Sequence, residues 1–313
     1  MFFMEKKVAI IIPAYKSRFL QQTLDSVAAQ TDKDFTVYIG DDASPHDLKN
    51  IVYLYQDKLD IVYYRFETNL GGQDLPGHWE RCIDMSKEPV VWLFSDDDLM
   101  PCDGVERIMK ALDKCGDKNV MFRFPLAVVD GEDNVIHENP TFVGEKISGY
   151  DFLLDKLEGR IYSAACEYVF SRDIYRKAGG FVKFPLAWCS DDATWTKFAD
   201  CAGGIIALPG KFVCWRNAEG ENISNSNCYD SRKIESTGLF LKWIANYYPD
   251  KLKEKKLGHA LKTYVHTVLH YSVRDKFSLC ELWKICCILR RIHLSVALSV
   301  AFRMCKVKLN KKR

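Results

Sequence analysis

The sequence predicts an α/β fold in which helices flank a mostly parallel central sheet, followed by a helical extension at the C-terminal end. Short β-rich runs alternate with helical patterns over the first 130 residues, and this alternation is typical of βαβ units. Residues 119–216 are more mixed, and from about Ile234 onward the pattern is helical to the end. We therefore expect an α/β domain over residues 1–225 and a helical extension over residues 226–313.

The first four strands are expected at residues 8–12, 36–39, 61–65 and 90–94. Between the first two, Ser17 is placed to cap a helix whose apolar residues, from Leu20 to Ala28, share one face. After the fourth strand, Pro101 is placed to open a helix and Gly116 to end it. Successive parallel strands deliver the residues that follow them to one edge of the sheet.

The second part of the α/β domain is expected to mix strands and helices. Apolar runs occur at residues 120–129, 168–170, 205–208 and 212–215, with helical patterns near residues 150–157 and 192–201. Breaks near Pro249 and Asp275 divide the helical extension.

The composition is that of a soluble globular protein. Of the 313 residues, 48% are apolar and 27% are charged, which excludes a disordered or low-complexity chain. The formal charge of +2 is too close to neutral for a general nucleic-acid binder. The charge is unevenly distributed, because residues 282–313 contain nine Lys or Arg and no Asp or Glu. An acidic body therefore carries a basic tail.

Targeting and cysteine patterns favour a cytoplasmic protein with reduced thiols. The 12 cysteines have no regular spacing and form no C-x-x-C pair, which disfavours a disulfide framework and a structural zinc site. Residues 1–7 are too few and too charged for the apolar part of a secretory signal. The late apolar run 292–302 is well short of the roughly 20 residues of a membrane-spanning helix.

Five acidic residues follow two of the expected strands. Asp41 and Asp42 come after the second strand, and Asp96, Asp97 and Asp98 follow the fourth. Because ligands of open α/β sheets bind at the carboxyl ends of the strands, we expect these acids at one edge. Their repulsion calls for a cation, and Mg²⁺ or Mn²⁺ prefers one or two carboxylates plus diphosphate oxygens. The alternative interpretation is that each cluster is a solvated turn or a helix cap.

Six motifs, in this order along the chain, resemble those of the family 2 glycosyltransferases of the GT-A fold. They are VAIIIPAY at 8–15, IGDDAS at 39–44, NLGG at 69–72, LFSDDD at 93–98, GGF at 179–181 and SDDATW at 190–195. The resemblance covers residues 6–225 and implies a Rossmann-like catalytic domain with a nucleotide-binding half at 1–98 and an acceptor half at 99–225. It also implies transfer of a hexosyl or N-acetylhexosaminyl group from a nucleotide diphosphate donor, expected to be a UDP-sugar, to an acceptor hydroxyl with inversion.

The same resemblance implies which residues hold the base and the ribose. Tyr15, which follows Pro13 and Ala14, would stack near the base. Asp41 would hydrogen-bond the base, and Asp42 would lie beside the ribose.

For the diphosphate, the run of three acids resembles the D-x-D element, whose acids bind the ribose and the metal on the diphosphate. Asp96 and Asp97 are implied for the nucleotide, and Asp97 and Asp98 for the metal. Two registers of this element stay open, one beginning at Asp96 and one at Ser95. Asn69 and Gly71 belong to the N-x-G element and complete this part of the predicted site.

The residues DDATW resemble the element that supplies the general base of the family. Asp192 is its second acid and is the expected base, with Asp191 beside it. Trp188, Trp195 and Phe184 are candidates for an apolar wall that raises the pKa of the base. The alternative is that both acids stabilise the first turn of the following helix, and the two roles can coexist.

Two departures from the family pattern concern basic residues. Relatives often carry a basic residue shortly after the N-x-G element, where this chain has Pro76 and Gly77, and Arg81 is the nearest candidate for the donor contact. Relatives also often place a His near the last core strand, where this chain has Arg216. Arg216 is a candidate diphosphate contact, and its alternative role is a surface ion pair.

The basic tail has two interpretations that stay open. An apolar stripe at Leu282, Ile285, Leu289, Ile292, Val296 and Val300 is flanked by Lys and Arg. Such a helix fits peripheral attachment to the inner face of the cytoplasmic membrane, next to a glycan or lipid-linked acceptor. It equally fits packing on the catalytic domain or on a second subunit of a homo-oligomer.

Two rival functions accompany the glycosyltransferase prediction. One is a non-catalytic module of the same fold that binds a nucleotide-sugar or a glycan. The other is a nucleotidyltransferase, which the absence of a basic, Gly-rich phosphate loop after Ile12 disfavours.

Overall fold

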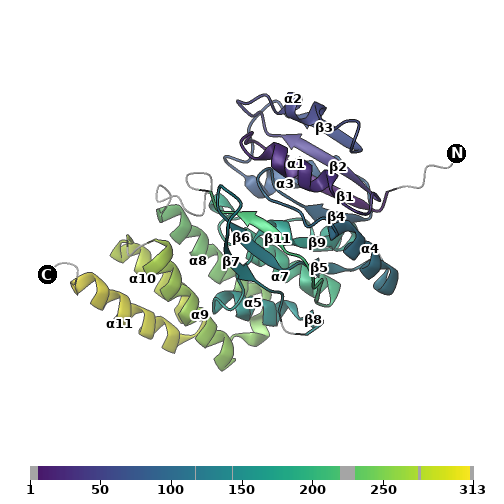
Figure 1. The fold of residues 1–313 in the computed structure, drawn as a ribbon. Coiled ribbons are helices and arrows are strands. Elements are labelled where there is room, and N and C mark those ends of the chain that lie inside the picture. Colours follow the sequence, from purple (N-terminus) through teal and green to yellow (C-terminus); the bar gives the residue numbers. More distant parts are fainter. Residues whose placement is uncertain (1–5, 117, 143, 219–229, 274–275, 311–313) are drawn as a thin grey trace. The chain divides into compact units, whose positions relative to one another are not determined.

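The computed structural model describes residues 6–116, 118–142, 144–218, 230–273 and 276–310 (Figure 1). The chain divides into two compact units. Unit 1 comprises Met1–Gly149, Ser163–Phe181 and Thr194–Asn222, and unit 2 comprises Tyr150–Tyr162, Val182–Ala193 and Ile223–Arg313. This division follows packing, and it assigns two segments of the predicted acceptor half to the helical unit.

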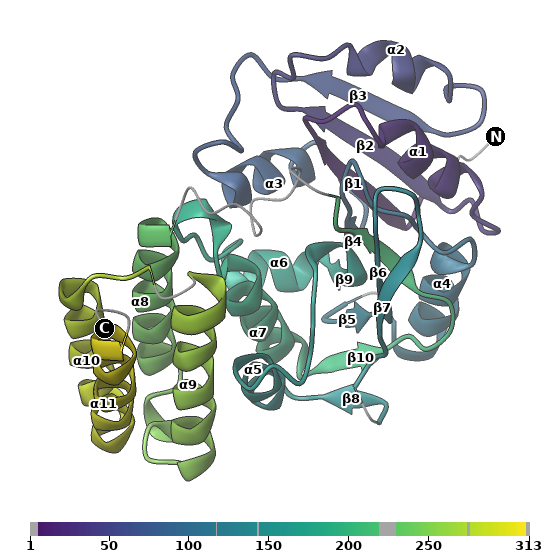
Figure 2. The ribbon, with the colours of Figure 1, turned by 60° about the vertical axis from the view of Figure 1, so that its left-hand side comes forward.

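Unit 1 is built on an eight-stranded, mostly parallel sheet. The strands of this sheet are labelled in Figure 2. The strand order is β3-β2-β1-β4-β9-β5-β10-β8, and β1 is parallel to both of its neighbours, β2 and β4. Only β9 and β8 pair antiparallel with their neighbours in this sheet. The bounds are β1 Val8–Ala14, β2 Phe35–Asp41, β3 Ile61–Arg65, β4 Val90–Leu93, β5 Met121–Arg123, β8 Lys146–Ile147, β9 Tyr168–Ser171 and β10 Ile205–Ala207.

A second, three-stranded sheet and six helices complete unit 1. The small sheet has the order β11-β6-β7, with β6 Leu126–Val129, β7 Val135–Asn139 and β11 Val213–Arg216. The helices are α1 Leu20–Ala28, α2 Leu48–Tyr53, α3 Leu75–Ile83, α4 Gly104–Cys115, α6 Arg172–Ala178 and most of α7 Ser190–Ala202. Strand β1 is almost completely buried, because its continuous apolar run lies in the middle of the sheet.

The predicted strands of the first half are confirmed, with bounds that differ by at most two residues at each end. Two predicted helix starts are wrong. Phe19 occupies the N-cap position of α1, and Ser17 contributes only its backbone carbonyl, which accepts from the Leu20 amide at 3.4 Å. Helix α4 begins at Gly104, after a turn in which the Gly104 amide donates to the Pro101 carbonyl. Gly116 ends α4 with a φ of 79°, as predicted.

Unit 2 is helical in the part that the structure describes. Its elements are α5 Gly149–Leu157, α8 Asp230–Tyr247, α9 Lys255–Thr267, α10 Leu279–Ile292 and α11 Leu294–Asn310, with short helical turns at Pro185–Ala187, Pro249–Lys251 and Val268–Ser272. Helices α8 to α11 lie side by side in both ribbon views (Figures 1 and 2). The predicted helical extension is therefore confirmed.

The apolar stripe of the tail lies inside unit 2. Leu282, Ile285 and Leu289 of α10 and Val296 and Val300 of α11 are all buried in one hydrophobic cluster with α8 and α9. The interpretation of this stripe as the membrane-facing surface is wrong, because its side chains pack on neighbouring helices. Among the described residues, none of the helices is both long enough and apolar enough to cross a membrane.

Candidate active site

Three neighbouring parallel strands bring the predicted nucleotide-binding residues to one edge of the large sheet. Ala14 of β1 is in register with Asp41 of β2, and Ile11 of β1 is in register with Leu93 of β4. The residues that follow these three strands therefore meet at their common carboxyl end. Pro13 and Ala14 are still within β1, and the Ala14 carbonyl accepts from the Asp42 amide at 2.9 Å.

Asp96 joins the end of β1 to the loop after β4. Its Oδ2 accepts from the backbone amides of Tyr15 and Lys16, both at 2.7 Å. Asp96 is 3% exposed, and its burial, with the charge of Asp97, raises the pKa of its carboxyl group. Tyr15, in contrast, is 43% exposed. The carboxylate of Asp96 therefore holds the turn that carries this aromatic ring.

Asp97 and Asp98 are buried beside it but contact different groups. Asp97 accepts from the Ser95 hydroxyl at 2.9 Å and from the ammonium of Lys16. Asp98 accepts from the Arg216 amide at 2.9 Å and from the Cys166 thiol. Burial and the charge of Asp97 raise the pKa of Asp98. The three acids thus form one buried cluster, and the ammonium of Lys16 balances part of its negative charge.

Asp41 is fully buried, and protein donors surround its carboxylate. Oδ1 accepts from the Ser44 amide at 2.8 Å, while Oδ2 accepts from the Tyr63 hydroxyl at 2.5 Å and from the Arg65 guanidinium at 2.8 Å. The Ser44 hydroxyl in turn donates to the Tyr15 carbonyl at 2.6 Å. Asp41 therefore shapes the turn after β2 in this structure.

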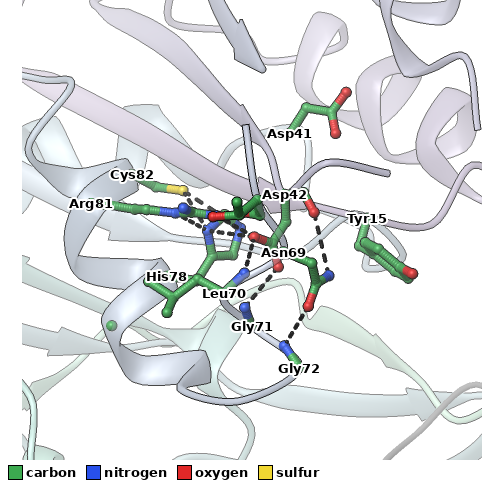
Figure 3. A network of polar contacts seen from close by, with 12 residues as sticks. Tyr15, Asp41, Asp42, Asn69, Leu70, Gly71, Gly72, His78, Arg81 and Cys82 are labelled. Atoms are coloured by element: carbon green, nitrogen blue, oxygen red, sulfur yellow. Dashed lines mark hydrogen bonds and ion pairs between the residues drawn. The ribbon is translucent and has the colours of Figure 1, made fainter. Parts of the chain in front are cut away.

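Asp42 organises the loop that follows β3 (Figure 3). Its carboxylate accepts from the amides of Leu70 and Gly71, each at 2.8 Å, and pairs with the guanidinium of Arg81. Asn69 continues the network, because its Nδ2 donates to the Asp42 carbonyl at 3.3 Å. The structure thus brings Asp42, Asn69, Gly71 and Arg81 together, as the motif positions suggest.

Arg216 lies beneath the acid cluster and is fully buried. Its guanidinium donates to the backbone carbonyl of Asp97 at 2.8 Å and to that of Asp130 at 3.1 Å, and it packs 4.2 Å from the ring centroid of Phe19. The guanidinium also pairs with the carboxylate of Asp133, a side chain that is 45% exposed, so the predicted ion pair is present although the arginine itself is buried. Arg216 holds the backbone of the acid loop, and its contact with a diphosphate stays a prediction.

Asp191 and Asp192 begin helix α7 and belong to unit 2. Oδ1 of Asp192 lies 2.9 Å from the ammonium of Lys156, and both side chains are less than a fifth exposed. Burial and the charge of Asp192 raise the pKa of Asp191 to about 7. The pair thus combines a carboxylate held by a lysine with a carboxyl group that titrates near neutrality.

The three aromatic residues predicted to form an apolar wall near this pair lie in different units. Trp195 is fully buried in the aromatic core of unit 1, with Tyr168 stacked on it at 4.8 Å, so it is a packing residue there. Trp188 and Phe184 pack against the hydrophobic cluster of unit 2, the unit that contains Asp191 and Asp192. The apolar wall itself stays a prediction for all three residues.

The acid cluster has the donor chemistry that Mg²⁺ and Mn²⁺ prefer. No group of three or more His, Cys, Asp or Glu is arranged to hold a metal ion within the described ranges. A magnesium or manganese site needs only one or two carboxylates when diphosphate oxygens complete the coordination. All three acids accept hydrogen bonds from the protein, so the assignment of the metal to Asp97 and Asp98 stays a prediction.

Sequence reasoning missed three residues at this edge. Lys16 contacts Asp96 and Asp97, Arg65 contacts Asp41, and His78 contacts Asp42. Lys16 directly follows the predicted Tyr15, and Arg65 ends a predicted strand, so both could have been found by asking which cations share the edge. His78 lies in α3, which the sequence analysis did not predict; burial lowers its pKa to about 4, so it is neutral at physiological pH.

The sheet order and the acidic edge are those of the GT-A class of α/β proteins, and solved structures support the fold. Staphylococcus aureus TarS in complex with UDP-GlcNAc superposes with a TM-score of 0.72 at 17% sequence identity, covering 95% of this chain and 89% of that one. The mannosyltransferase PcManGT from Pyrobaculum calidifontis, in complex with GDP-Man and Mn²⁺, has a TM-score of 0.51 at 15% identity, covering 99% of this chain and 89% of that chain.

The family itself follows from the sequence match. The family described as "Glycosyl transferase family 2" matches residues 9–177, which is more than half of the chain. The chain belongs to glycosyl transferase family 2, which confirms the resemblance carried by the six motifs.

Two curated relatives match part of the chain. The GalNAc(5)-diNAcBac-PP-undecaprenol beta-1,3-glucosyltransferase of Campylobacter jejuni is 26% identical over 164 residues, which are 50% of each protein. An uncharacterized glycosyltransferase of Rickettsia typhi is 26% identical over 197 residues, 61% of this chain and 58% of that protein. The chain thus spans about half the length of the curated relatives it matches.

Proposed function

We propose that this protein is an inverting glycosyltransferase that moves a hexosyl or N-acetylhexosaminyl group from a UDP-sugar to an acceptor hydroxyl. The observation that carries the proposal is the edge formed by β1, β2 and β4, where an exposed tyrosine ring and three buried aspartates meet. An aromatic surface suits a nucleobase, and the acids suit a metal-bound diphosphate.

On the nucleotide side, Tyr15 stacks on the base and the loop held by Asp42 borders the ribose. The carboxylates of Asp41 and Asp42 accept several hydrogen bonds from the protein. Their role in donor binding is therefore to fix the shape of the base and ribose subsite, with Asn69 and Gly71 forming its rim. Arg81 neutralises Asp42, and Arg216 holds the acid loop from beneath.

Asp97 and Asp98 hold Mg²⁺ or Mn²⁺ together with diphosphate oxygens. When bound, the cation supplies neutralising charge to the departing nucleoside diphosphate. Two of the chain's own groups prepare this arrangement. The Ser95 hydroxyl orients Asp97, and the backbone amide of Arg216 orients Asp98.

Asp192 removes the proton from the acceptor hydroxyl. A carboxylate is a weak base toward a sugar hydroxyl, so proton transfer occurs late, when the anomeric carbon has oxocarbenium character and the attacking oxygen has become acidic. The ammonium of Lys156 fixes the orientation of the Asp192 carboxylate. The raised pKa of Asp191 makes it a candidate to receive that proton near neutral pH.

The names of the relatives support a UDP-linked donor and a lipid-linked acceptor. The C. jejuni protein is named for an undecaprenol-linked acceptor, and the S. aureus structure contains UDP-GlcNAc. We propose a UDP-linked donor and a glycan or lipid-linked acceptor on that basis, with the protein acting in the cytoplasm.

Contact with the membrane surface is part of this proposal, through a different set of residues than the buried stripe. Among the residues of α10 and α11 whose side chains the structure describes, the exposed large apolar ones are Leu279, Trp283, Leu294, Leu298 and Phe302. Arg290, Arg291 and Arg303 on the same two helices are also exposed. Exposed apolar side chains combined with basic ones suit an anionic lipid surface.

The first experiment is calorimetric titration of the protein with UDP, GDP and dTDP, each with and without Mn²⁺. We expect metal-dependent binding of UDP that is lost in Asp98→Ala and retained in Asp173→Ala, which removes an exposed aspartate of α6. Binding of GDP or dTDP alone would revise the donor. Absence of binding to all three in the presence of Mn²⁺ would overturn the proposed function.

A further inference from the structure

The ammonium of Lys16 occupies the acid cluster at the edge of the large sheet. It pairs with Oδ2 of Asp97 and lies 3.7 Å from Oδ1 of Asp96. These are the carboxylates of the run after β4, and Asp97 is one of the two that we assign to the divalent cation. Lys16 therefore pairs with a carboxylate that would hold the metal.

The position of Lys16 is imposed by the backbone. The amides of Tyr15 and Lys16 both donate to Oδ2 of Asp96 at 2.7 Å, so the Lys16 side chain starts from a fixed point at the end of β1. Because the donors are backbone amides, these two hydrogen bonds can still form when the Lys16 side chain is substituted. The ion pair with Asp97 can thus be removed without removing the anchor of the turn.

Burial and charge explain why a cation is present there. Asp96, Asp97 and Asp98 are 3%, 5% and 2% exposed, and adjacent buried carboxylates repel one another. The Lys16 side chain is 27% exposed, against 5% for Asp96 and 7% for Asp97. The ammonium is held on a flexible chain with access to solvent, so it can leave the cluster without unfolding the turn.

We propose that Lys16 is a resident counter-ion of the donor site that exchanges with the divalent cation at Asp97. Two cations bound to the carboxylate of Asp97 would repel one another strongly, so the ammonium would leave when a metal binds. The released ammonium then has the diphosphate as its nearest new anionic partner. The exchange makes the site a poor binder of free metal and a good binder of metal together with a nucleoside diphosphate.

This inference rests on the proposed function, because it requires a metal and a diphosphate at the same edge. It adds that Lys16 makes binding of the metal depend on the nucleotide. The protein stays charge-compensated while it is empty, and the complete metal–nucleotide pair is needed to displace the lysine.

The test compares the affinity for Mn²⁺ alone, measured by electron paramagnetic resonance of unbound Mn²⁺, in wild type and in Lys16→Met and Lys16→Gln. We expect both variants to bind Mn²⁺ alone at least tenfold more tightly than wild type, and to bind UDP more weakly at saturating Mn²⁺. Lys110→Met is the matched control, because Lys110 also pairs with a carboxylate, that of Glu106, on an exposed helix face. We expect no change in that variant.

An unchanged affinity for Mn²⁺ alone in a folded Lys16 variant would overturn the inference. Wild-type protein that binds Mn²⁺ equally well with and without UDP would also overturn it, and that measurement needs no variant to fold. Either result leaves the proposed function standing if UDP still binds with the metal. Failure of every nucleotide to bind would instead overturn the proposed function.

Discussion

The ammonium of Lys156 lies 2.9 Å from Oδ1 of Asp192 and fixes the position of this carboxylate. The proposed role of Asp192 as general base can be tested with a nearly isosteric substitution. Asp192→Asn keeps the shape of the side chain and removes the base. We expect the rate of sugar transfer to fall by about 10²–10⁴-fold, the usual contribution of a general base. Binding of UDP with Mn²⁺, measured by calorimetry, is expected to stay unchanged.

The control for this change is Asp173→Asn. Asp173 lies in the first turn of α6, as Asp192 does in α7, and it is exposed. Full transfer activity in Asp192→Asn would exclude Asp192 as the base. Asp191 would then be the next candidate for the base.

Asp191 has a predictable effect on the pH dependence of stability. Its pKa is raised to about 7 in the folded protein, against about 3.9 in an unfolded chain, so the folded state binds more protons between these values. The contribution of Asp191 to the free energy of unfolding therefore decreases as the pH rises from about 4 to 7. We expect Asp191→Asn to be more stable than wild type by about 1–3 kcal/mol at pH 8 and equal to it at pH 4.

Urea unfolding at the two pH values measures this difference. A stability gain of the same size at both pH values would contradict the assignment, because a titrating carboxyl group cannot produce it.

The loop between β3 and α3 depends on a close approach of backbone to carboxylate. A Cβ atom at Gly71 would lie 2.7 Å from Oδ2 of Asp42, the oxygen that accepts from the Gly71 amide. We expect Gly71→Ala to displace this loop and to weaken UDP binding at least tenfold. The destabilisation is expected to be about 1–3 kcal/mol, the usual cost of a steric clash in a packed site.

Calorimetry and thermal unfolding measure the two effects. Gly131→Ala is the control, because a Cβ atom there meets nothing closer than 3.7 Å. Normal UDP affinity in Gly71→Ala would show that this loop does not border the nucleotide.

Elements differ in how well sequence patterns predict them. The central strands are predicted to within two residues because each is a continuous apolar run with polar residues at its end. Helix α3 is not predicted, because Pro76 and Gly77 in its first turn are residues typical of a loop. Its start depends on the Asp74 side chain, which accepts from the Gly77 amide at 2.9 Å.

At the scale of the whole molecule, the proposed contact with lipid is assigned to the helical unit. The exposed apolar side chains of α10 and α11 are available for such contact, whereas the buried stripe is not. We expect the protein to sediment with anionic vesicles, and Trp283→Ser combined with Phe302→Ser to reduce the bound fraction several-fold. Thermal unfolding is expected to change little, because both side chains are at least 70% exposed.

Neutral vesicles and Val62→Ser, which alters an exposed apolar residue of β3, are the controls. Equal binding of wild type and the double variant would remove α10 and α11 from the proposed contact.

Local patterns in the sequence determined the class of fold, the acids at the strand ends and the family, because strand periodicity and motif order are properties of neighbouring residues. The tertiary structure alone decided what each acid contacts. Asp41 meets Tyr63 and Arg65, Arg216 lies buried beneath Asp97, and the stripe of the tail packs inward. These outcomes depend on the partners that packing brings from distant parts of the chain, and no local pattern encodes them.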